Sequence, residues 1–307
     1  MQNEKWYVIV NPAAGNGAGA RHWHKIEPLL REAMPNSIFV LTQKRDHARE
    51  LAAEAIRQGY RQLLGVGGDG TNNEIINGIF AQKVAPVNEV IYTLLPVGTG
   101  NDWVRTHGIP RKIDAWLRML AAGKTMLHDV GLAHFMKDKT PHERYFVNVA
   151  GMAYDAFVVE YAERYKKWII HKLLYLLMVV RCLFLYRLPK AKVIFDHKTD
   201  EDFYYTINIG ISKYSGGGMQ LVPHANPTDG LLALTLARKV TKLGVLLNTY
   251  RFYNGTLHRH PKIDIFQAKT IRVEPIDFIQ LELDGELVGE APVSFSILEK
   301  ALRIIVP

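Results

Sequence analysis

The sequence predicts a two-domain protein: an N-terminal α/β domain with a parallel sheet, then a mostly antiparallel β-sandwich or barrel. The 307-residue chain exceeds the length at which one hydrophobic core keeps growing. Its first third alternates strand-like and helical segments, whereas its second half holds many strand-like runs and few helical ones. We place the boundary between residues 128 and 129, and leave open whether residues 298–307 complete the first domain.

In the first domain, apolar runs alternate with helical ones. The expected strands are residues 6–10, 37–41, 62–66 and 90–95. The expected helices are residues 18–32, 46–58, 71–80 and 112–122. Such alternation favours a parallel sheet covered by helices, and sites in these sheets lie at the carboxyl ends of the strands.

The second domain has a different pattern of elements. Its expected strands are residues 145–149, 190–195, 203–211, 231–237, 270–274, 279–283 and 293–297. Two segments are expected to be helical, residues 155–187 and 240–253, the first as one long apolar helix. Many strands with few helices favour antiparallel pairing.

The charge is unevenly spread. The chain holds 38 Lys and Arg against 30 Asp and Glu, a net charge of +8. Residues 161–192 carry +7 and residues 238–262 carry +6, so the remainder is −5. Basic blocks attract the phosphates of nucleic acids or of anionic bilayers. No nucleic-acid recognition motif is found, so we expect no nucleic-acid partner.

The cysteine content and the hydropathy of the chain indicate its cellular compartment. The single cysteine, Cys182, lies in an apolar stretch and is interpreted as a buried thiol. The start of the chain lacks the basic and apolar regions of a signal peptide. Lys172, Arg181 and Arg187 interrupt the most apolar region, which makes it a poor membrane span. We therefore expect a cytoplasmic protein.

Three glycine-rich turns each follow an expected strand of the first domain. They are Asn11-Pro12-Ala13-Ala14-Gly15-Asn16-Gly17, Gly67-Gly68-Asp69-Gly70-Thr71-Asn72-Asn73-Glu74 and Pro96-Val97-Gly98-Thr99-Gly100-Asn101-Asp102. Glycines let backbone N–H groups approach an anion, and a following helix adds unpaired donors and a positive dipole end. One such turn is compatible with a purely structural role, but three at one sheet edge favour phosphate binding.

Carboxylates stand within and opposite these turns. Asp69 would repel phosphate without a metal ion or ordered water, so it indicates Mg²⁺ nearby; the alternative is an Asx turn. Asp284 and Glu286 flank Gly285 after an apolar strand. Two nearby acids raise one another's pKa, which suits a general base for a hydroxyl; the alternative is an ordinary acidic hairpin turn. Asp229-Gly230 is by itself a standard turn pair.

The three turns, in this order and spacing, resemble the diacylglycerol kinase catalytic domain, a family that also includes sphingosine and ceramide kinases. The resemblance continues through Phe146-Val147-Asn148, Gly216-Gly217-Gly218, Pro223-His224-Ala225, Asp229-Gly230-Leu231 and Asp284-Gly285-Glu286. It covers nearly the whole chain, and the length is similar to that of the bacterial branch. The Gly-Gly-Asp-Gly signature is shared with NAD kinases.

The resemblance implies roles for particular residues. The proton acceptor is Glu286, supported by Asp284, with Asp69 as a further catalytic carboxylate. The nucleotide-binding residues are Asn11, Gly15, Thr42, Gly67, Gly68, Asp69, Gly70, Thr71, Asn72, Asn73, Glu74, Thr99, Asn101 and Asp102. The implied magnesium site comprises Asp229 with carbonyl groups near Asn226 and Leu231. The implied cofactors are ATP and Mg²⁺.

One position departs from the family pattern. Many members carry Lys after the first turn, where this chain has Asn16, so a point charge on the phosphates is missing there. Arg21 and Lys44 are candidate substitutes.

The implied function is ATP-dependent phosphorylation of a lipid hydroxyl, with diacylglycerol converted to phosphatidate as the first candidate. Two alternatives stay open: a soluble-substrate kinase of the NAD-kinase type, and a nucleotide-sensing, membrane-binding protein without catalysis. The basic, apolar 161–188 region indicates peripheral binding to the inner, anionic face of the membrane, although such a helix is also compatible with a core position. Whether the chain forms a homodimer is left open.

Overall fold

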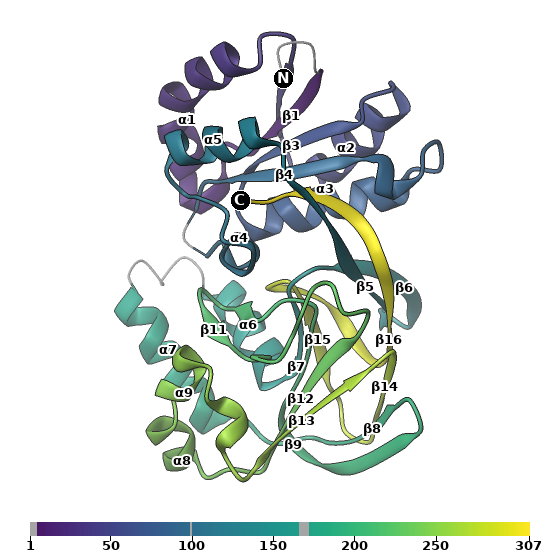
Figure 1. The fold of residues 1–307 in the computed structure, drawn as a ribbon. Coiled ribbons are helices and arrows are strands. Elements are labelled where there is room, and N and C mark those ends of the chain that lie inside the picture. The colour runs from purple at the N-terminus through teal and green to yellow at the C-terminus, as the bar shows by residue number, and fades with distance from the viewer. Residues whose placement is uncertain (1–4, 99, 166–171) are drawn as a thin grey trace.

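The computed structural model describes residues 5–98, 100–165 and 172–307, which form two lobes (Figure 1). The N-terminal lobe is an α/β domain. Its strands lie in the order β2, β1, β3, β4, and every one of these neighbours is parallel. The strands are β1 (Trp6–Val10), β2 (Ile38–Leu41), β3 (Gln62–Gly67) and β4 (Ile91–Pro96). The helices are α1 (Ala14–Ala33), α2 (His47–Arg57), α3 (Asp69–Ala81), α4 (Asp102–His107) and α5 (Ile113–Ala122), with a 3₁₀ turn, η1 (Val87–Glu89).

The C-terminal lobe is built from antiparallel strands. Six of them, β9, β7, β15, β16, β14 and β8, pair in a closed circuit, which makes a barrel. The strands of this part of the chain are β5 (Thr125–Lys137), β6 (Thr140–Phe146), β7 (Val149–Ala153), β8 (Lys190–Phe195), β9 (Lys198–Gly210), β10 (Tyr214–Ser215), β11 (Met219–Gln220), β12 (Leu232–Arg238), β13 (Ile263–Ala268), β14 (Thr270–Pro275), β15 (Gln280–Leu283) and β16 (Glu286–Ile305). The helical segments are α6 (Tyr154–Arg164), α7 (Lys172–Leu185), α8 (Lys242–Leu247), α9 (Tyr250–Asn254) and the 3₁₀ turn η2 (Leu257–Arg259).

Two long strands join the lobes. β5 runs across the expected boundary at 128/129 and pairs with β16 from residue 125 to residue 136. The end of β16 then pairs parallel with β4 through Arg303 and Ile304. The chain's last strand therefore extends the N-terminal sheet, although the boundary itself stays a prediction.

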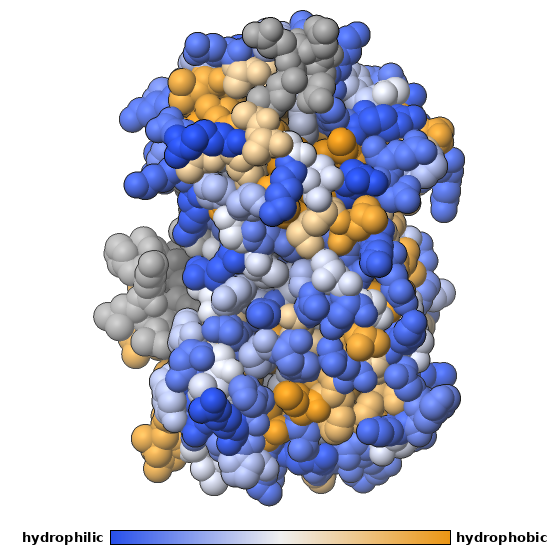
Figure 2. Space-filling model, viewed as in Figure 1, coloured by the Kyte–Doolittle hydropathy of each residue, from blue (hydrophilic) through white to orange (hydrophobic). Residues whose placement is uncertain are grey.

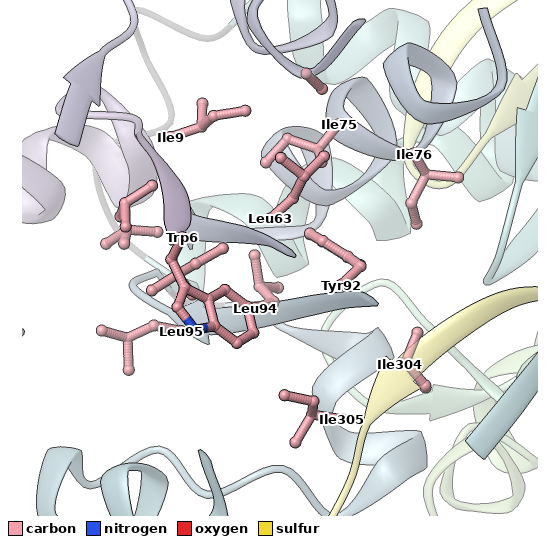
Figure 3. Close-up of a cluster of buried hydrophobic side chains, with 14 of the residues drawn as sticks. Trp6, Ile9, Leu63, Ile75, Ile76, Tyr92, Leu94, Leu95, Ile304 and Ile305 are labelled. Atoms are coloured by element: carbon pink, nitrogen blue, oxygen red, sulfur yellow. The ribbon is translucent and has the colours of Figure 1, made fainter. Parts of the chain in front are cut away.

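Each lobe has its own hydrophobic core. In the N-terminal core, the side chains of Trp6, Leu63 and Tyr92 come from neighbouring strands (Figure 3). Ile304 and Ile305 of β16 pack into the same cluster, while Ile75 and Ile76 of α3 cover one face of the sheet (Figure 3). This packing fixes α3, and with it the second glycine-rich turn, against the carboxyl ends of β3 and β4.

The expected single long apolar helix over residues 155–187 is wrong. The described residues form two helices, α6 and α7, and residues 166–171, including Trp168, lie outside the described part of the chain. Val158 of α6 packs against Met178 and Cys182 of α7, a contact that one continuous helix could not make. Cys182 is a buried free thiol, as expected, and burial raises its pKa to about 11.

Two further expectations fail in detail. The expected strand at 145–149 is split, because β6 ends at Phe146 and β7 begins at Val149, with the backbone N–H groups of Val147 and Asn148 turned to the Asp284 carboxylate. The expected helix at 240–253 is two short helices, α8 and α9. Within the described residues, no helix is long and apolar enough to cross a membrane.

Candidate active site

The three glycine-rich turns meet beside one another at the carboxyl edge of the N-terminal sheet. A Cβ placed on Gly98 would lie 3.8 Å from the backbone of Gly15, and one on Gly68 would lie 3.8 Å from Asn101 Oδ1. Gly100 approaches Asp69 so closely that a Cβ there would lie 2.9 Å from the carboxylate. The turns therefore line one surface, which includes the N-terminus of α3.

Side chains within the turns lock them together. Asn11 Nδ2 donates to Thr71 Oγ1 at 2.8 Å, joining the first turn to the second. The Asp69 carboxylate accepts from the backbone N–H groups of Asp102 and Trp103 at 3.1 and 3.2 Å, joining the second turn to α4. Because α4 begins there, Asp69 caps its first turn, where a negative charge is favourable.

Two of the expected nucleotide-binding side chains have hydrogen-bond partners within the protein. Asn72 is fully buried and accepts a hydrogen bond from the Tyr92 hydroxyl at 2.8 Å. Glu74 accepts from the backbone N–H groups of Asp46 and Ala48, so its carboxylate lies at the start of α2. Thr42 lies after β2, where its N–H donates to Val10. Thr99 and the side chain of Asn16 are outside what the structure describes.

The second group of carboxylates comes from the C-terminal lobe. Asp284 and Gly285 form the two-residue turn between β15 and β16, with φ of 52° and 88°. Both angles are those of a type I′ hairpin turn, which favours the Asp-Gly pair. The turn brings Asp284 to the glycine-rich turns: Asp284 Oδ2 accepts from Asn73 Nδ2 of α3 at 2.8 Å.

Asp69, Asp102 and Asp284 line one cavity of about 180 Å³ between the lobes. Its opposite wall is the hairpin of β10 and β11, and Gly217 N–H of that hairpin donates to Asp102 Oδ2 at 2.8 Å. Figure 1 shows α4, which carries Asp102, at the junction of the lobes. The sequence pattern had placed these carboxylates on separate motifs, and the fold brings them together.

Burial dominates the electrostatics of this cavity. It raises the pKa of Asp102 to about 6; the nearby charge of Asp69 adds to the rise, and the Gly217 N–H opposes it. Burial also raises the pKa of Asp284 to about 6, with Asp69 again contributing and three N–H donors opposing. The mutual effect of Asp284 and Glu286 expected from the sequence is therefore not the cause of this shift.

Glu286 has a different environment from Asp284. Its Oε2 atom pairs with Arg144 Nη2 at 2.9 Å and with Arg45 Nη2 at 3.2 Å. A Cβ on Gly70 would lie 3.2 Å from Glu286 Oε1, so the carboxylate adjoins the start of α3. Sequence reasoning missed both arginines, since neither belongs to a glycine-rich or acidic motif.

One oxygen of the cavity is a candidate ligand for a divalent cation. Asp102 Oδ1 is buried with no hydrogen-bond partner, and the nearest cation is Arg105 Nε at 4.0 Å. An unpaired carboxylate oxygen beside two other carboxylates is the kind of oxygen ligand that Mg²⁺ takes. However, the described residues hold no cluster of three or more His, Cys, Asp or Glu side chains arranged to hold a metal.

The second implied metal site lies on the loop before β12. Asp229 Oδ1 accepts from Leu231 N–H at 3.1 Å, and Oδ2 accepts from Gln267 Nε2 at 3.0 Å. Asn226 Oδ1 accepts from Thr228. The loop thus holds Asp229 next to Leu231, and a magnesium ion there stays a prediction.

The fold and the cavity define a class: a two-domain phosphotransferase in which glycine turns of an α/β domain face carboxylates from a β-domain. Comparison of the sequence with models of protein families gives a matching result. Residues 5–133 match the diacylglycerol kinase catalytic domain, and residues 148–306 match the YegS C-terminal NAD kinase beta sandwich-like domain. The chain belongs to the diacylglycerol kinase family, bacterial branch, and is a phosphotransferase of the lipid-kinase class.

Curated relatives cover nearly the whole chain. A diacylglycerol kinase of Staphylococcus saprophyticus is 27% identical over 302 residues, covering 98% of this chain and 94% of that protein. A diacylglycerol kinase of Staphylococcus aureus is also 27% identical, covering 98% of this chain and 91% of that protein.

Solved structures are similar in fold. A diacylglycerol kinase structure from Bacillus anthracis superimposes with a TM-score of 0.73 at 22% identity, covering 99% of this chain and 97% of that one. Yeast NADH kinase complexed with NADH gives a TM-score of 0.52 at 10% identity, covering 99% and 84%. The two-lobed architecture is thus shared beyond lipid kinases.

Proposed function

We propose that the protein transfers the γ-phosphate of ATP to the hydroxyl group of a lipid, with diacylglycerol as the acceptor and phosphatidate as the product. The observation that carries the proposal is the hydrogen bond between Asn73 and Asp284, because it brings the glycine-rich turns and the acidic hairpin turn to one cavity. The kinase family supports ATP as donor. The names of the curated relatives support diacylglycerol as acceptor.

The residues in and beside the cavity have distinct roles in this proposal. The backbone N–H groups at Gly68 and the start of α3 orient the phosphates, with the helix dipole favouring negative charge. The acceptor oxygen attacks the γ-phosphorus, the bond to the bridging β–γ oxygen breaks, and ADP leaves. The hydroxyl proton passes to a Glu286 carboxylate oxygen, and Asp284 fixes the turn that carries Glu286.

Asp69 and Asp102 would hold Mg²⁺ in this cavity. When bound, the ion supplies neutralisation of phosphate oxygen charge. Asp69 also keeps α4 in place through its two N–H bonds, so a change at Asp69 acts on geometry as well as on charge. Most of the catalysis in such transfers comes from positioning and electrostatics.

We also propose that an anionic bilayer binds a surface formed by α7, α8 and α9. Hydrophobic residues on this surface are more than half exposed: Leu177, Phe184, Leu185, Leu243, Leu247, Tyr250 and Tyr253. Figure 2 shows hydrophobic side chains at the lower left edge, where Figure 1 places α8. Exposed apolar residues gathered in this way are typical of interaction sites.

Basic residues surround these side chains. Arg181, Arg187, Lys239 and Arg259 are exposed. Lys242 Nζ donates to the Phe184 carbonyl at 2.5 Å and lies 5.3 Å from the centre of its ring, so α7 and α8 form one surface. Apolar side chains with a basic rim complement an anionic bilayer, where each cation contributes about 1 kcal/mol.

A substrate panel tests the acceptor. Purified protein with labelled ATP is offered diacylglycerol, a sphingoid base, a long-chain alcohol and NAD in parallel. The proposal predicts labelled phosphatidate at the highest kcat/KM. Labelling of NAD in preference to every lipid would identify a soluble-substrate kinase instead, and ATP binding without any product would favour a sensor.

A further inference from the structure

Arg144 of β6 is connected to both carboxylates of the turn between β15 and β16. It contacts Glu286 directly and Asp284 through Asn73. Its Nη2 atom pairs with Glu286 Oε2 at 2.9 Å, and its Nε atom donates to Asn73 Oδ1 at 2.8 Å. Asn73 in turn donates to Asp284 Oδ2. A single guanidinium therefore contacts the proposed proton acceptor directly and the neighbouring Asp284 through one amide.

The site of Arg144 is preorganised. The Arg144 and Glu286 side chains are only 19% and 21% exposed, so water screens their interaction less than that of a surface ion pair. The planar guanidinium holds Asn73 through Nε and Nη2 and Glu286 through Nη2, a two-nitrogen geometry that a lysine cannot reproduce. Arg45 contacts the same Glu286 oxygen, but its side chain is 64% exposed.

Two further carboxylates lie near Glu286. Glu74 of α3 is close enough for its charge to interact with that of Glu286, and Asp284 lies two residues away in the turn. Without the arginines, these like charges would repel the Glu286 carboxylate from its place beside the start of α3. Arg144, the less exposed cation, is best placed to oppose them.

We infer that Arg144 is a positioning residue that keeps the Glu286 carboxylate aimed at the start of α3, so that it can accept the proton of the lipid hydroxyl. This inference rests on the proposed function of Glu286. It assigns to β6 a part in catalysis that no glycine-rich or acidic motif of the chain indicates.

Steady-state kinetics with labelled ATP and diacylglycerol in neutral detergent micelles test the inference. Arg144→Met is expected to lower kcat about tenfold while the KM values for ATP and diacylglycerol change by less than about twofold, because Arg144 acts on Glu286 and not on either substrate. Thermal unfolding is measured beside the kinetics, so that a loss of folded protein is not counted as a loss of kcat.

Three further variants complete the test. Arg144→Lys keeps the charge and is expected to recover part of the lost kcat. Arg45→Met, at an exposed side chain compatible with folding, is expected to lower kcat by less. Arg272→Met removes an equally charged side chain that pairs with Glu274 on β14, and is expected to leave kcat unchanged.

The outcomes separate the two proposals. If Arg144→Met leaves kcat unchanged, or raises the KM values without lowering kcat, the inference about Arg144 is overturned while the proposed function stands. If Glu286→Gln retains the full wild-type rate, the proposed role of Glu286 fails, and the inference about Arg144 fails with it.

Discussion

Asn73 Nδ2 donates a hydrogen bond of 2.8 Å to Asp284 Oδ2, joining two residues that lie 211 positions apart in the chain. Asn73 belongs to the helix that starts at the second glycine-rich turn, and Asp284 belongs to the hairpin turn of the other lobe. Asp284 also accepts from the N–H groups of Val147 and Asn148. One buried carboxylate thus contributes several of the contacts that set the relative position of the two sets of candidate catalytic groups.

Replacing Asn73 should therefore impair both stability and catalysis. Asn73→Leu removes the donor to Asp284 and leaves buried polar groups unpaired, at an expected cost of about 1–3 kcal/mol in the free energy of unfolding. Asn77→Leu is the comparison variant, because Asn77 is on the same helix and bonds to Tyr145 and to Asn73 Oδ1 but not to Asp284. Urea unfolding and kcat are measured for both. Equal loss of kcat in the two variants would contradict a specific role for the Asn73–Asp284 bond.

A substitution at Gly68 tests whether the second turn binds nucleotide without disturbing the structure of the turn. A Cβ at Gly68 has no neighbour closer than 3.8 Å, and its φ of −109° suits other residues. We expect Gly68→Ala to unfold at the wild-type temperature but to bind ATP at least tenfold more weakly, because the methyl group occupies the space where phosphate approaches N–H groups.

The neighbouring glycine provides the contrast. A Cβ on Gly67 would lie 2.4 Å from Thr71 Oγ1 within a buried strand, so Gly67→Ala should lower the melting temperature. Calorimetry and equilibrium ATP binding distinguish the two effects. Unchanged ATP affinity in Gly68→Ala would show that the phosphates do not approach this turn.

Because His128 is buried, we expect the folded protein to lose stability in acid. It is fully buried, accepts from Trp103 Nε1 at 3.4 Å, and burial lowers its pKa to about 4. The unfolded chain binds the proton near pH 6.5 but the folded chain binds it only near pH 4, so the contribution of His128 is fully present above pH 6.5 and is lost as the pH falls towards 4.

A non-titrating replacement isolates this effect. The free energy of unfolding of the wild type minus that of His128→Gln should fall by about 3 kcal/mol between pH 6.5 and pH 4. His107, a buried neighbour whose pKa is also lowered by burial, remains in both proteins, so the difference removes its contribution except for the part that the His128 charge causes. A difference that is constant with pH would mean that His128 titrates normally in the folded state.

The α7–α9 surface predicts salt-sensitive binding to anionic vesicles. Leu243→Glu combined with Leu247→Glu places two negative charges among the exposed apolar side chains and should reduce co-sedimentation with phosphatidylglycerol vesicles by more than tenfold. Val84→Glu is the control, since Val84 is an exposed apolar residue of the other lobe. Vesicle binding that persists in the double variant, or that does not weaken as salt rises, would contradict the proposal that this surface binds the bilayer.

The sequence predicted the elements whose signals are local. Alternating apolar runs located the four N-terminal strands, and Asn-, Asp- and Gly-rich turns located the edge where they end. Contacts between distant segments were not predictable in this way. Arg144 lies outside every motif, and Arg45 stands near Thr42 with no role of its own implied. The closure of the cavity by Gly217 depends on a hairpin that approaches α4 only in the folded protein. The 155–187 segment was misinterpreted because its apolar composition does not show where the chain folds back.

The sequence also did not show which side chains within one motif face the cavity. Asn72 and Glu74 stand in the second turn beside Asp69, yet the helical turn directs Asn72 to Tyr92 and Glu74 to the start of α2. Side-chain direction along α3, which depends on the start of the helix at Asp69, decides which residues face the cavity. Composition alone could not distinguish them.

The central claim is that this protein phosphorylates a lipid hydroxyl with groups from both lobes. The most direct measurement is the formation of labelled phosphatidate from labelled ATP and diacylglycerol micelles by wild type, Asp69→Asn and Glu286→Gln. The account predicts product from the wild type and a loss of at least a hundredfold in kcat for each variant, with folding confirmed by calorimetry. Full phosphatidate formation by both variants, or none by the wild type, would contradict it.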